Sequence, residues 1–293
     1  MTEKISDNQT GLLGIIGGTG LYHIEGLKIT NQIEVFTPFG IPSAPLTIGK
    51  IGDQGVIFLP RHGLNHQIMP SEVNFRANIY ALKNAGVTRI ISISAVGSLK
   101  AELPMGDFVI PNQYFDWTKG IRKHTFFGEG MIAHVSTAEP ACAHLTDIIK
   151  SAGEKNGIHI HTGATYACVE GPRLGTRAES NYFKNIVGCD VVGMSNVPEA
   201  FLAKEAQLCY ATIAIITDYD CWLDDPAQHV SVAQVFKTYD KSIHKVKDLL
   251  GQMLHTPLPE TECECRTSLQ YSMLTPEEVL TEEKMKILKV LKK

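Results

Sequence analysis

Strand-like apolar runs alternate with helix-like segments along most of the chain, and this alternation constrains the fold more than any other feature. It predicts an α/β protein, because strands separated by helical segments usually build a sheet covered by helices. The expected strands are 12–16, 33–36, 45–51, 56–59, 89–94, 108–111, 158–169, 190–193 and 210–216.

Helix signals lie between and after these runs. The apolar residues that follow Ser71 are spaced so that they would lie on one face of a helix. Asn196 and Glu199 have the spacing of a capping box. The expected helices follow Ser71, cover 197–207 and 231–253, and run from a cap at 275–278 to Leu291. The segment 255–272 is rich in proline, threonine and glutamate, so we expect a domain over 1–254 and a linker with a helical extension over 255–293.

Composition narrows the function classes. The net charge is −4 and 20% of the residues are charged, so the basic stripe typical of a nucleic-acid-binding protein is not indicated. The first ten residues are polar and lack the apolar centre of a signal peptide, and no apolar stretch approaches the ~20 residues that span a bilayer. We expect a soluble cytoplasmic protein with a small-molecule partner.

The chain contains seven cysteines, of which Cys263 and Cys265 form a C-x-C pair in a polar segment. No further ligand follows this pair at zinc-like spacing, so the sequence predicts no metal site. Two interpretations remain for the pair: reduced, incidental thiols, or a local redox or disulfide element.

Five apolar runs end in glycine-rich or polar groups. Ligands of open α/β sheets collect beyond the carboxyl ends of strands, so these ends predict one composite pocket. The runs are GIIGGTG (14–20), IFLPRHG (57–63), ISISAVGS (91–98), VVGMSN (191–196) and IAIITDYD (213–220).

The first two ends suit an anion. Glycines around Thr19 let backbone amides approach a phosphate, although a tight structural turn is the alternative. The dinucleotide pattern G-x-G-x-x-G fails, because His23 stands at its last position. Arg61 can contact phosphate in a bidentate manner, while a surface ion pair for Arg61 and a structural role for His62 are the alternatives.

The remaining ends bring hydroxyls and acids. Ser94 and Ser195 stand at strand ends, where a lone serine is more often a turn or cap residue. Asp218 and Asp220 follow a buried run, and a carboxyl group in a partly apolar pocket has a raised pKa and can donate a proton. A turn or N-cap pair is the alternative for the two aspartates.

Eight motifs occur in register over about residues 12 to 250: GIIGGTGL, TPFG, RHG-xx-H-xx-MPSEVNFRANI, AVGSL, GD-x-VIP-x-Q, EGPR-xx-TRAES, GM-x-x-VPEA-xLAKEA and TDYDCW. Together they resemble the 5′-methylthioadenosine phosphorylase family of the purine nucleoside phosphorylase superfamily. The final ~40 residues match this family less well.

The resemblance implies a three-layer α/β fold with a twisted mixed β-sheet flanked by helices, and a homotrimer or hexamer. It implies phosphorolysis of 5′-methylthioadenosine to adenine and 5-methylthioribose 1-phosphate, a pentosyl transfer in purine and methionine salvage. Inorganic phosphate is then a co-substrate, and no metal or organic cofactor is implied.

The resemblance also implies roles for single residues. The phosphate site would consist of Thr19, Arg61, His62, Ser94 and Ser195. Asp218 would act at purine N7 and Asp220 would face the 6-amino group. The other substrate-binding positions would be Ala95, Leu174, Gly193 and Met194, the methylthio-pocket residues Val232, Val235 and Phe236, and His134 donated by a neighbouring subunit.

Two positions depart from many relatives. Leu174 stands where phenylalanine often stacks on the purine, and Gly193 stands where some members have asparagine. The alternatives that remain are a phosphorylase for 6-oxopurine nucleosides or methylthioinosine, a nucleoside hydrolase, and a non-catalytic nucleoside sensor. Asp218 distinguishes these candidates, because phosphorylases for 6-oxopurine nucleosides generally have asparagine at this position.

Overall fold

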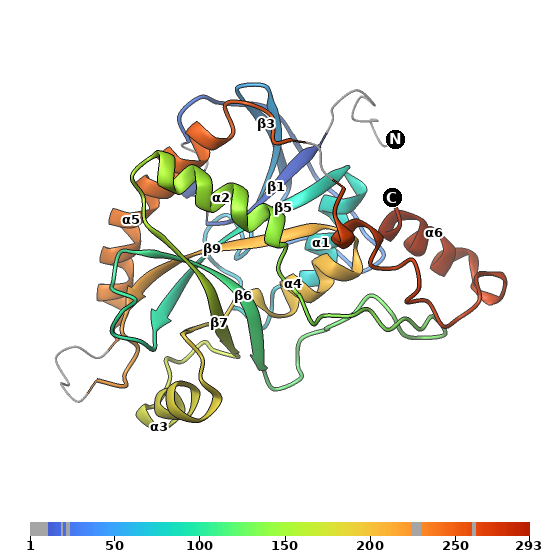
Figure 1. The fold of residues 1–293 in the computed structure, drawn as a ribbon. Helices are drawn as coiled ribbons and strands as arrows, with labels where there is room; N and C mark the ends of the chain where they lie inside the picture. Colours follow the sequence, from blue (N-terminus) through green and yellow to red (C-terminus); the bar gives the residue numbers. More distant parts are fainter. Residues whose placement is uncertain (1–10, 19, 22–23, 224–229, 260–261) are drawn as a thin grey trace.

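The computed structural model describes residues 11–18, 20–21, 24–223, 230–259 and 262–293. A nine-stranded mixed sheet runs through the molecule in the order β2-β3-β4-β1-β5-β8-β7-β6-β9 (Figure 1). The strands are β1 (Leu12–Gly17), β2 (Leu27–Ile33), β3 (Leu46–Ile51), β4 (Gln54–Pro60), β5 (Val87–Ser98), β6 (Phe108–Trp117), β7 (Ile160–Val169), β8 (Val191–Gly193) and β9 (Cys209–Asp218).

The sheet closes on itself around β5. β5 pairs with β1 and β9 in parallel and with β8 in an antiparallel manner. β9 also pairs with β6, so β5, β8, β7, β6 and β9 form a closed ring of strands. The long central strand therefore borders three others, and residues near its end lie between several strand ends.

Helices cover both faces of this sheet. The α-helices are α1 (Phe75–Asn84), α2 (Ala143–Lys155), α3 (Arg177–Tyr182), α4 (Asn196–Glu205), α5 (Val232–Met253) and α6 (Glu282–Leu291). One apolar core unites α1, α4 and α6 with one face, and another unites α2 and α5 with the opposite face. Alternation along β1 explains the two cores: Leu12 and Ile16 enter the first, Leu13 and Ile15 the second.

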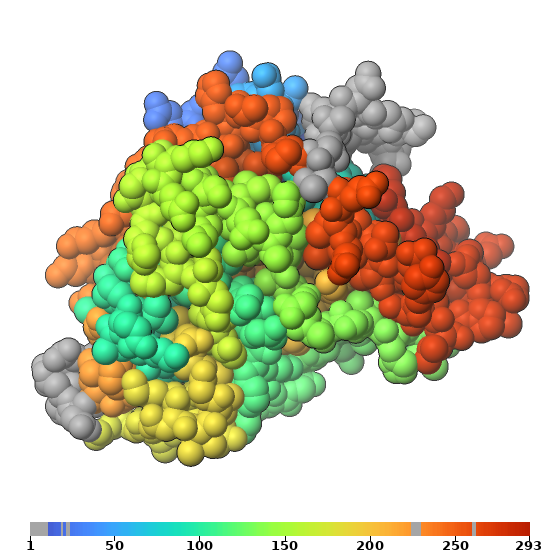
Figure 2. Space-filling view, viewed as in Figure 1, coloured from blue at the N-terminus to red at the C-terminus, as the bar shows by residue number. Residues whose placement is uncertain are grey.

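The expected three-layer α/β fold is thus confirmed. The C-terminal segment packs on the rest of the chain, because Ile287, Leu288 and Leu291 of α6 are buried beside α1. Figure 2 shows this segment in red beside the green segment that precedes α2. The division into 1–254 and 255–293 stays a prediction.

Two predicted elements begin elsewhere. The strand expected over 33–36 is β2, which ends at Ile33 because its last pairing is with Leu46 and the chain then turns. The helix expected after Ser71 starts at Phe75, because the Asn74 side chain accepts from the amide of Ala77. Ser71 instead donates to the backbone oxygen of Glu170 at 3.2 Å.

Two predicted caps are wrong. Ser195 is the N-cap of α4, and the side chain of Asn196 donates to buried hydroxyl groups instead of capping. The last helix is capped by Thr281, which accepts from the amide of Lys284, while the expected cap region forms a 3₁₀ turn over Glu277–Val279.

Two helices, α2 and α3, were not predicted. α3 carries a capping box of Thr176 and Glu179, a spacing that is readable in the sequence. α2 is capped by the thiol of Cys142, a residue type that rarely signals a helix start. Among the described residues, every helix is too short or too polar to span a bilayer.

Candidate active site

The C-terminal half of β5 brings most of the predicted site residues together. Its parallel register with β9 places Ser94 opposite Ala214, Ala95 opposite Ile215 and Gly97 opposite Asp218. Gly97 also pairs with Val192 of β8, next to Gly193. The predicted convergence of strand ends is therefore present for this group.

The two aspartates form the acidic end of the cluster. Asp218 is 4% exposed and Asp220 7% exposed. Thr217 Oγ1 donates to Asp218 Oδ2 at 2.7 Å, and the amide of Asp220 donates to Asp218 Oδ1 at 2.8 Å. Both bonds fix the orientation of the Asp218 carboxyl group.

Burial raises the pKa of Asp218 to about 6, although the hydrogen bonds from Thr217 and Asp220 act in the opposite direction. Burial also raises the pKa of Asp220. Near neutral pH, Asp218 therefore exchanges its proton readily, which is the property that an acid–base group needs. The turn-pair alternative for the aspartates explains their backbone contact but not their burial.

Glycine at position 97 makes room for these acids. A Cβ atom there would lie 2.8 Å from Asp218 Oδ1 and 3.2 Å from Asp220 Cβ. Gly175 borders the other side, since a Cβ atom on it would lie 3.7 Å from Asp220 Oδ1. Leu174 directly precedes Gly175 in the chain and is 37% exposed.

Ala95 of β5 and Gly193 of β8 continue the cluster, and Met194 directly follows Gly193 in the chain. A Cβ atom on Gly193 would lie 3.3 Å from the backbone oxygen of Ala95 and 2.1 Å from the Tyr166 hydroxyl. Tyr166 therefore fills the space that a larger residue at 193 would need. The ring of Tyr166 therefore explains why this chain has glycine at position 193, where some relatives have asparagine.

Arg61 is buried, with 2% of its surface exposed, and forms a bidentate pair with Glu199 at 2.7 and 2.8 Å. Its Nη1 donates to the backbone oxygen of Ile93 and its Nη2 to Ser92 Oγ. Burial acts to lower the pKa of Arg61, but the Glu199 charge outweighs it, so the guanidinium stays charged. Within the described part of the chain, these bonds leave one Nη1 hydrogen for a ligand.

His62 is held in one neutral form. Its Nδ1 lies 2.9 Å from the backbone oxygen of Ile68, which can only accept, so Nδ1 carries the proton. Burial lowers the pKa of His62 to about 4, and the Arg61 charge acts in the same direction. At neutral pH the Nε2 atom is therefore a hydrogen-bond acceptor.

Both predicted serines adjoin Asn196, Ser94 through a hydrogen bond and Ser195 as the preceding residue. Ser94 Oγ donates to Asn196 Oδ1 at 3.3 Å and is buried. Ser195 is half-buried, stands at the N-terminus of α4 and makes no side-chain cap bond there. A helix N-terminus whose N-cap hydroxyl makes no cap bond favours an anion.

The start of α5 approaches the acidic end. The amide of Val230 donates to the backbone oxygen of Asp220 at 2.8 Å, and α5 begins two residues later. Val232 is 60% exposed and Phe236 58% exposed, while Val235 is half-buried. Further along α5, Tyr239 reaches the glycine turn, where a Cβ atom on Gly18 would lie 3.5 Å from its hydroxyl.

Two predicted residues are not placed in this cluster. His134 is exposed, and its amide donates to the backbone oxygen of Ser272, in the segment beside the C-terminal residues. Thr19 lies outside the described residues. The sequence motifs gave no site role to Gly97, Tyr166, Asn196, Glu199 and Tyr239, because none stands in a pattern typical of catalysis.

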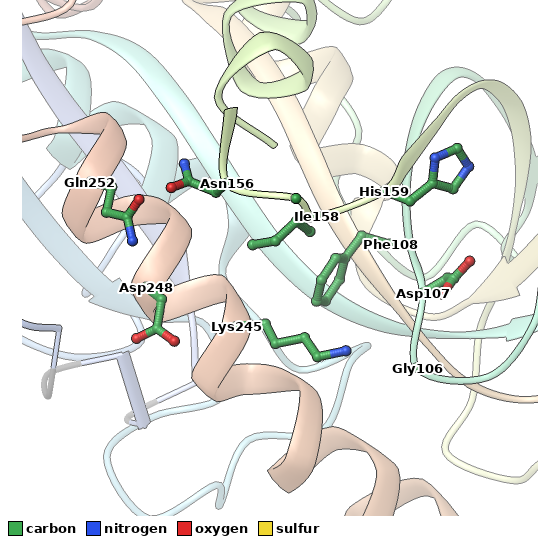
Figure 3. A pocket seen from close by; sticks show the side chains of 10 residues that line it. Gly106, Asp107, Phe108, Asn156, Ile158, His159, Lys245, Asp248 and Gln252 are labelled. Atoms are coloured by element: carbon green, nitrogen blue, oxygen red, sulfur yellow. The ribbon is translucent and has the colours of Figure 1, made fainter. Parts of the chain in front are cut away.

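A separate hollow of about 520 Å³ lies between the C-terminal half of α5 and the loops before β6 and β7 (Figure 3). Its walls include Asp107, His159, Lys245 and Asp248. Among the residues that the structure describes, no predicted site residue lines it, so it is distinct from the cluster on β5.

Comparison with known proteins agrees with this geometry. Residues 12–253 match the model of the phosphorylase superfamily. The S-methyl-5′-thioadenosine phosphorylase of Geobacter sulfurreducens is 43% identical over 272 residues, which cover 93% of this chain and 94% of the relative. The chain belongs to the S-methyl-5′-thioadenosine phosphorylase family.

Solved structures of this phosphorylase family have the same fold. A methylthioadenosine phosphorylase from an Antarctic soil metagenomic library superposes with a TM-score of 0.89, at 40% identity, over 96% of this chain and 99% of its own. The Schistosoma mansoni enzyme in complex with adenine superposes with a TM-score of 0.79, at 39% identity, over 84% and 91%. The family resemblance inferred from the motifs is thus confirmed.

Proposed function

We propose that the chain cleaves the glycosidic bond of 5′-methylthioadenosine with inorganic phosphate and releases adenine and 5-methylthioribose 1-phosphate. Membership of the family, at 43% identity over nearly the whole chain, supports this reaction. The site assignment depends on one observation. Two buried acids lie beside β5, and several hydroxyl groups close to Arg61 lie along the same strand.

At the acidic end, Asp218 acts on the leaving base. As the bond between C1′ and N9 breaks, the purine gains negative charge, and a proton from Asp218 at N7 neutralises it. Asp220 accepts a hydrogen bond from the 6-amino group. A 6-oxopurine would instead bring an oxygen lone pair against a carboxylate, so the pair favours aminopurines.

At the other end, phosphate attacks C1′ on the face opposite the base. The hydroxyls of Ser94 and Ser195 and the N-terminus of α4 surround the anion. Neutral His62 accepts a hydrogen bond from a phosphate hydroxyl at Nε2. Arg61 supplies positive charge and its remaining Nη1 hydrogen, while Glu199 holds the guanidinium plane. We place Thr19 in the same site.

The ribose lies between these ends, over Ala95, Gly193 and Met194, and Leu174 packs on the purine. The exposed apolar side chains of Val232 and Phe236, with Val235, receive the methylthio group, because a thioether needs no hydrogen-bond partner. His134, which is exposed, completes the 5′ pocket of a neighbouring subunit in a homotrimer, or in a hexamer built from trimers.

The second candidate, phosphorolysis of 6-oxopurine nucleosides or methylthioinosine, is disfavoured by the two buried carboxyl groups. One experiment separates the candidates. The purified chain is incubated with methylthioadenosine, methylthioinosine or inosine, with and without phosphate, and the products are identified by chromatography and mass spectrometry. We expect adenine and the sugar phosphate from methylthioadenosine only when phosphate is present. Adenine release without phosphate would indicate a hydrolase, and preference for the oxopurines would overturn the base assignment.

A further inference from the structure

Four of the seven cysteines lie together although they are far apart in the sequence. The Sγ atoms of Cys142, Cys209, Cys263 and Cys265 are all within 4.8 Å of one another. Cys263 is half-buried and the other three are buried. The C-x-C pair has no further ligand close to it in the sequence, and the fold brings the other two thiols from distant segments.

Three separate elements hold these thiols. Cys142 is the N-cap of α2, and Cys209 is the first residue of β9. The amide of Cys142 donates to the backbone oxygen of Tyr210 at 2.8 Å, which fixes the helix start to the strand. Cys263 and Cys265 come from the connector after α5, at the start of a short 3₁₀ helix.

We propose that the four thiolates bind one Zn²⁺ ion. A tetrahedral site with Zn–S bonds of about 2.3 Å has sulfur atoms about 3.8 Å apart. Cys142 and Cys263 lie 3.6 Å apart, and no pair is more than about 1 Å beyond this spacing. An all-sulfur set excludes Mg²⁺ and Ca²⁺, which prefer oxygen ligands.

The surroundings suit a negatively charged zinc–thiolate group. The amide of Leu145 donates to Cys142 Sγ at 3.4 Å, and the N-terminus of α2 points its dipole at the same sulfur. Lys204 Nζ lies 3.8 Å from Cys265 Sγ. Such outer hydrogen bonds orient the ligands and offset their charge.

The site is structural, because all four coordination positions are taken by the protein. It fastens the connector to the sheet and to α2. Cys209 begins β9 and Asp218 ends it, so at about 3.3 Å per residue the zinc site lies roughly 30 Å from the candidate acid. The metal therefore contributes to stability and takes no part in phosphorolysis.

The rival is a pair of disulfide bonds within the same four residues. A disulfide would bring two sulfur atoms to about 2.05 Å and remove two hydrogen atoms per bond. Zinc leaves all four thiols chemically reduced. Metal content and the mass of the intact denatured chain therefore distinguish the two states.

The test uses the full chain, purified without a metal-affinity step and dialysed against metal-free buffer. We expect one zinc per chain by elemental mass spectrometry and the fully reduced mass. Cys265→Ala should lose the zinc, and Cys189→Ala, which removes a buried thiol outside the cluster, should keep it. Wild-type chain that is free of metal, with either reduced or bridged cysteines, would overturn the proposal.

A second measurement does not depend on a variant that folds. Replacement of the bound metal by Co²⁺ should give the visible absorption bands and thiolate charge-transfer bands of a tetrahedral cobalt–thiolate site. Removal of the metal with a chelator should lower Tm, while kcat/KM for methylthioadenosine stays unchanged below the new Tm. A cobalt-treated chain without these bands, or a chelated chain with unchanged Tm, would contradict the zinc site.

Discussion

At Asp218, two opposing effects act on a single carboxyl group. Burial favours the protonated form, whereas the hydrogen bonds from Thr217 and Asp220 favour the ionised form. Burial prevails and raises the pKa to about 6. A group poised in this range can donate its proton in the reaction and recover it afterwards.

The raised pKa of Asp218 predicts the pH dependence of the reaction. Because the proposed role of Asp218 needs its protonated form and the pKa is about 6, kcat/KM for methylthioadenosine should fall as the pH rises through about 6. Asp218→Asn should lower kcat/KM by about 10²- to 10⁴-fold, the usual contribution of a general acid. The ionisation of phosphate affects the wild type and Asp218→Asn equally. The ratio of their kcat/KM values, followed against pH, therefore reports the ionisation of Asp218 alone. A ratio that does not change with pH would contradict this role.

Glu199 is proposed to affect phosphate binding indirectly, through its ion pair with Arg61. Glu199→Gln leaves the buried charge of Arg61 without its partner, which costs about 3–5 kcal/mol in other proteins. We expect a clear fall in Tm by calorimetry and a higher KM for phosphate. Glu277→Gln, which breaks the exposed pair with Lys292, is the control and should change neither value measurably. An unchanged KM for phosphate in Glu199→Gln would indicate that Arg61 does not belong to the phosphate site.

The sequence points to the residues for which we propose a part in the reaction, and it does not point to the residues that hold them in place. Asp218 and Asp220 stand out because acids rarely follow a buried strand. Glu199 was interpreted as part of a helix cap, since its partner Arg61 lies 138 positions earlier. Tyr166 was not singled out, because its contact with Gly193 exists only after β7 and β8 pair.

At the scale of elements, β5 organises the molecule. It contacts β1, β8 and β9, and its C-terminal half carries Ser94, Ala95 and Gly97. Most strands were predictable because long apolar runs define them, as in β4 and β9. β2 was placed wrongly because it is a mostly exposed edge strand, and Asn31 interrupts the alternation of Leu27, Ile29 and Ile33.

The first turns of α5 predict substrate preference. Phe236→Ser removes an apolar side chain that is 58% exposed, so the fold should tolerate it. Loss of an apolar contact with the methylthio group should lower kcat/KM for methylthioadenosine by about 10- to 100-fold, and that for adenosine by less. Val279→Ser, which alters another exposed apolar residue far along the chain, should change neither. Equal losses for both nucleosides would exclude Phe236 from the 5′ pocket.

At the scale of the whole molecule, two cores on opposite faces of one sheet account for the layers. The sequence predicted these layers through strand and helix alternation. It did not predict that β9 closes a ring with β5 and β6, or that Cys142 and Cys209 meet the C-x-C pair. Such contacts depend on the sheet order, which no local pattern records.

The proposed role of His134 in the pocket of a neighbouring subunit predicts a site shared between subunits. His134→Ala should lower kcat/KM for methylthioadenosine without changing the oligomeric state measured by light scattering. Coexpression of His134→Ala with Asp218→Asn chains should yield mixed oligomers more active than either variant alone, because some sites then combine intact His134 and intact Asp218. Activity no higher than the average of the two variants would place His134 outside the site.

The missing side chain at position 97 has a consequence for the evolution of this site. A methyl group there would collide with the carboxylate of Asp218, even though the backbone at Gly97 needs no left-handed conformation. The residues that position 97 accepts are therefore limited by the acids at the end of a different strand, β9. A randomised library selected for growth on methylthioadenosine should return glycine at position 97, and other residues should reappear there only together with changes at position 218.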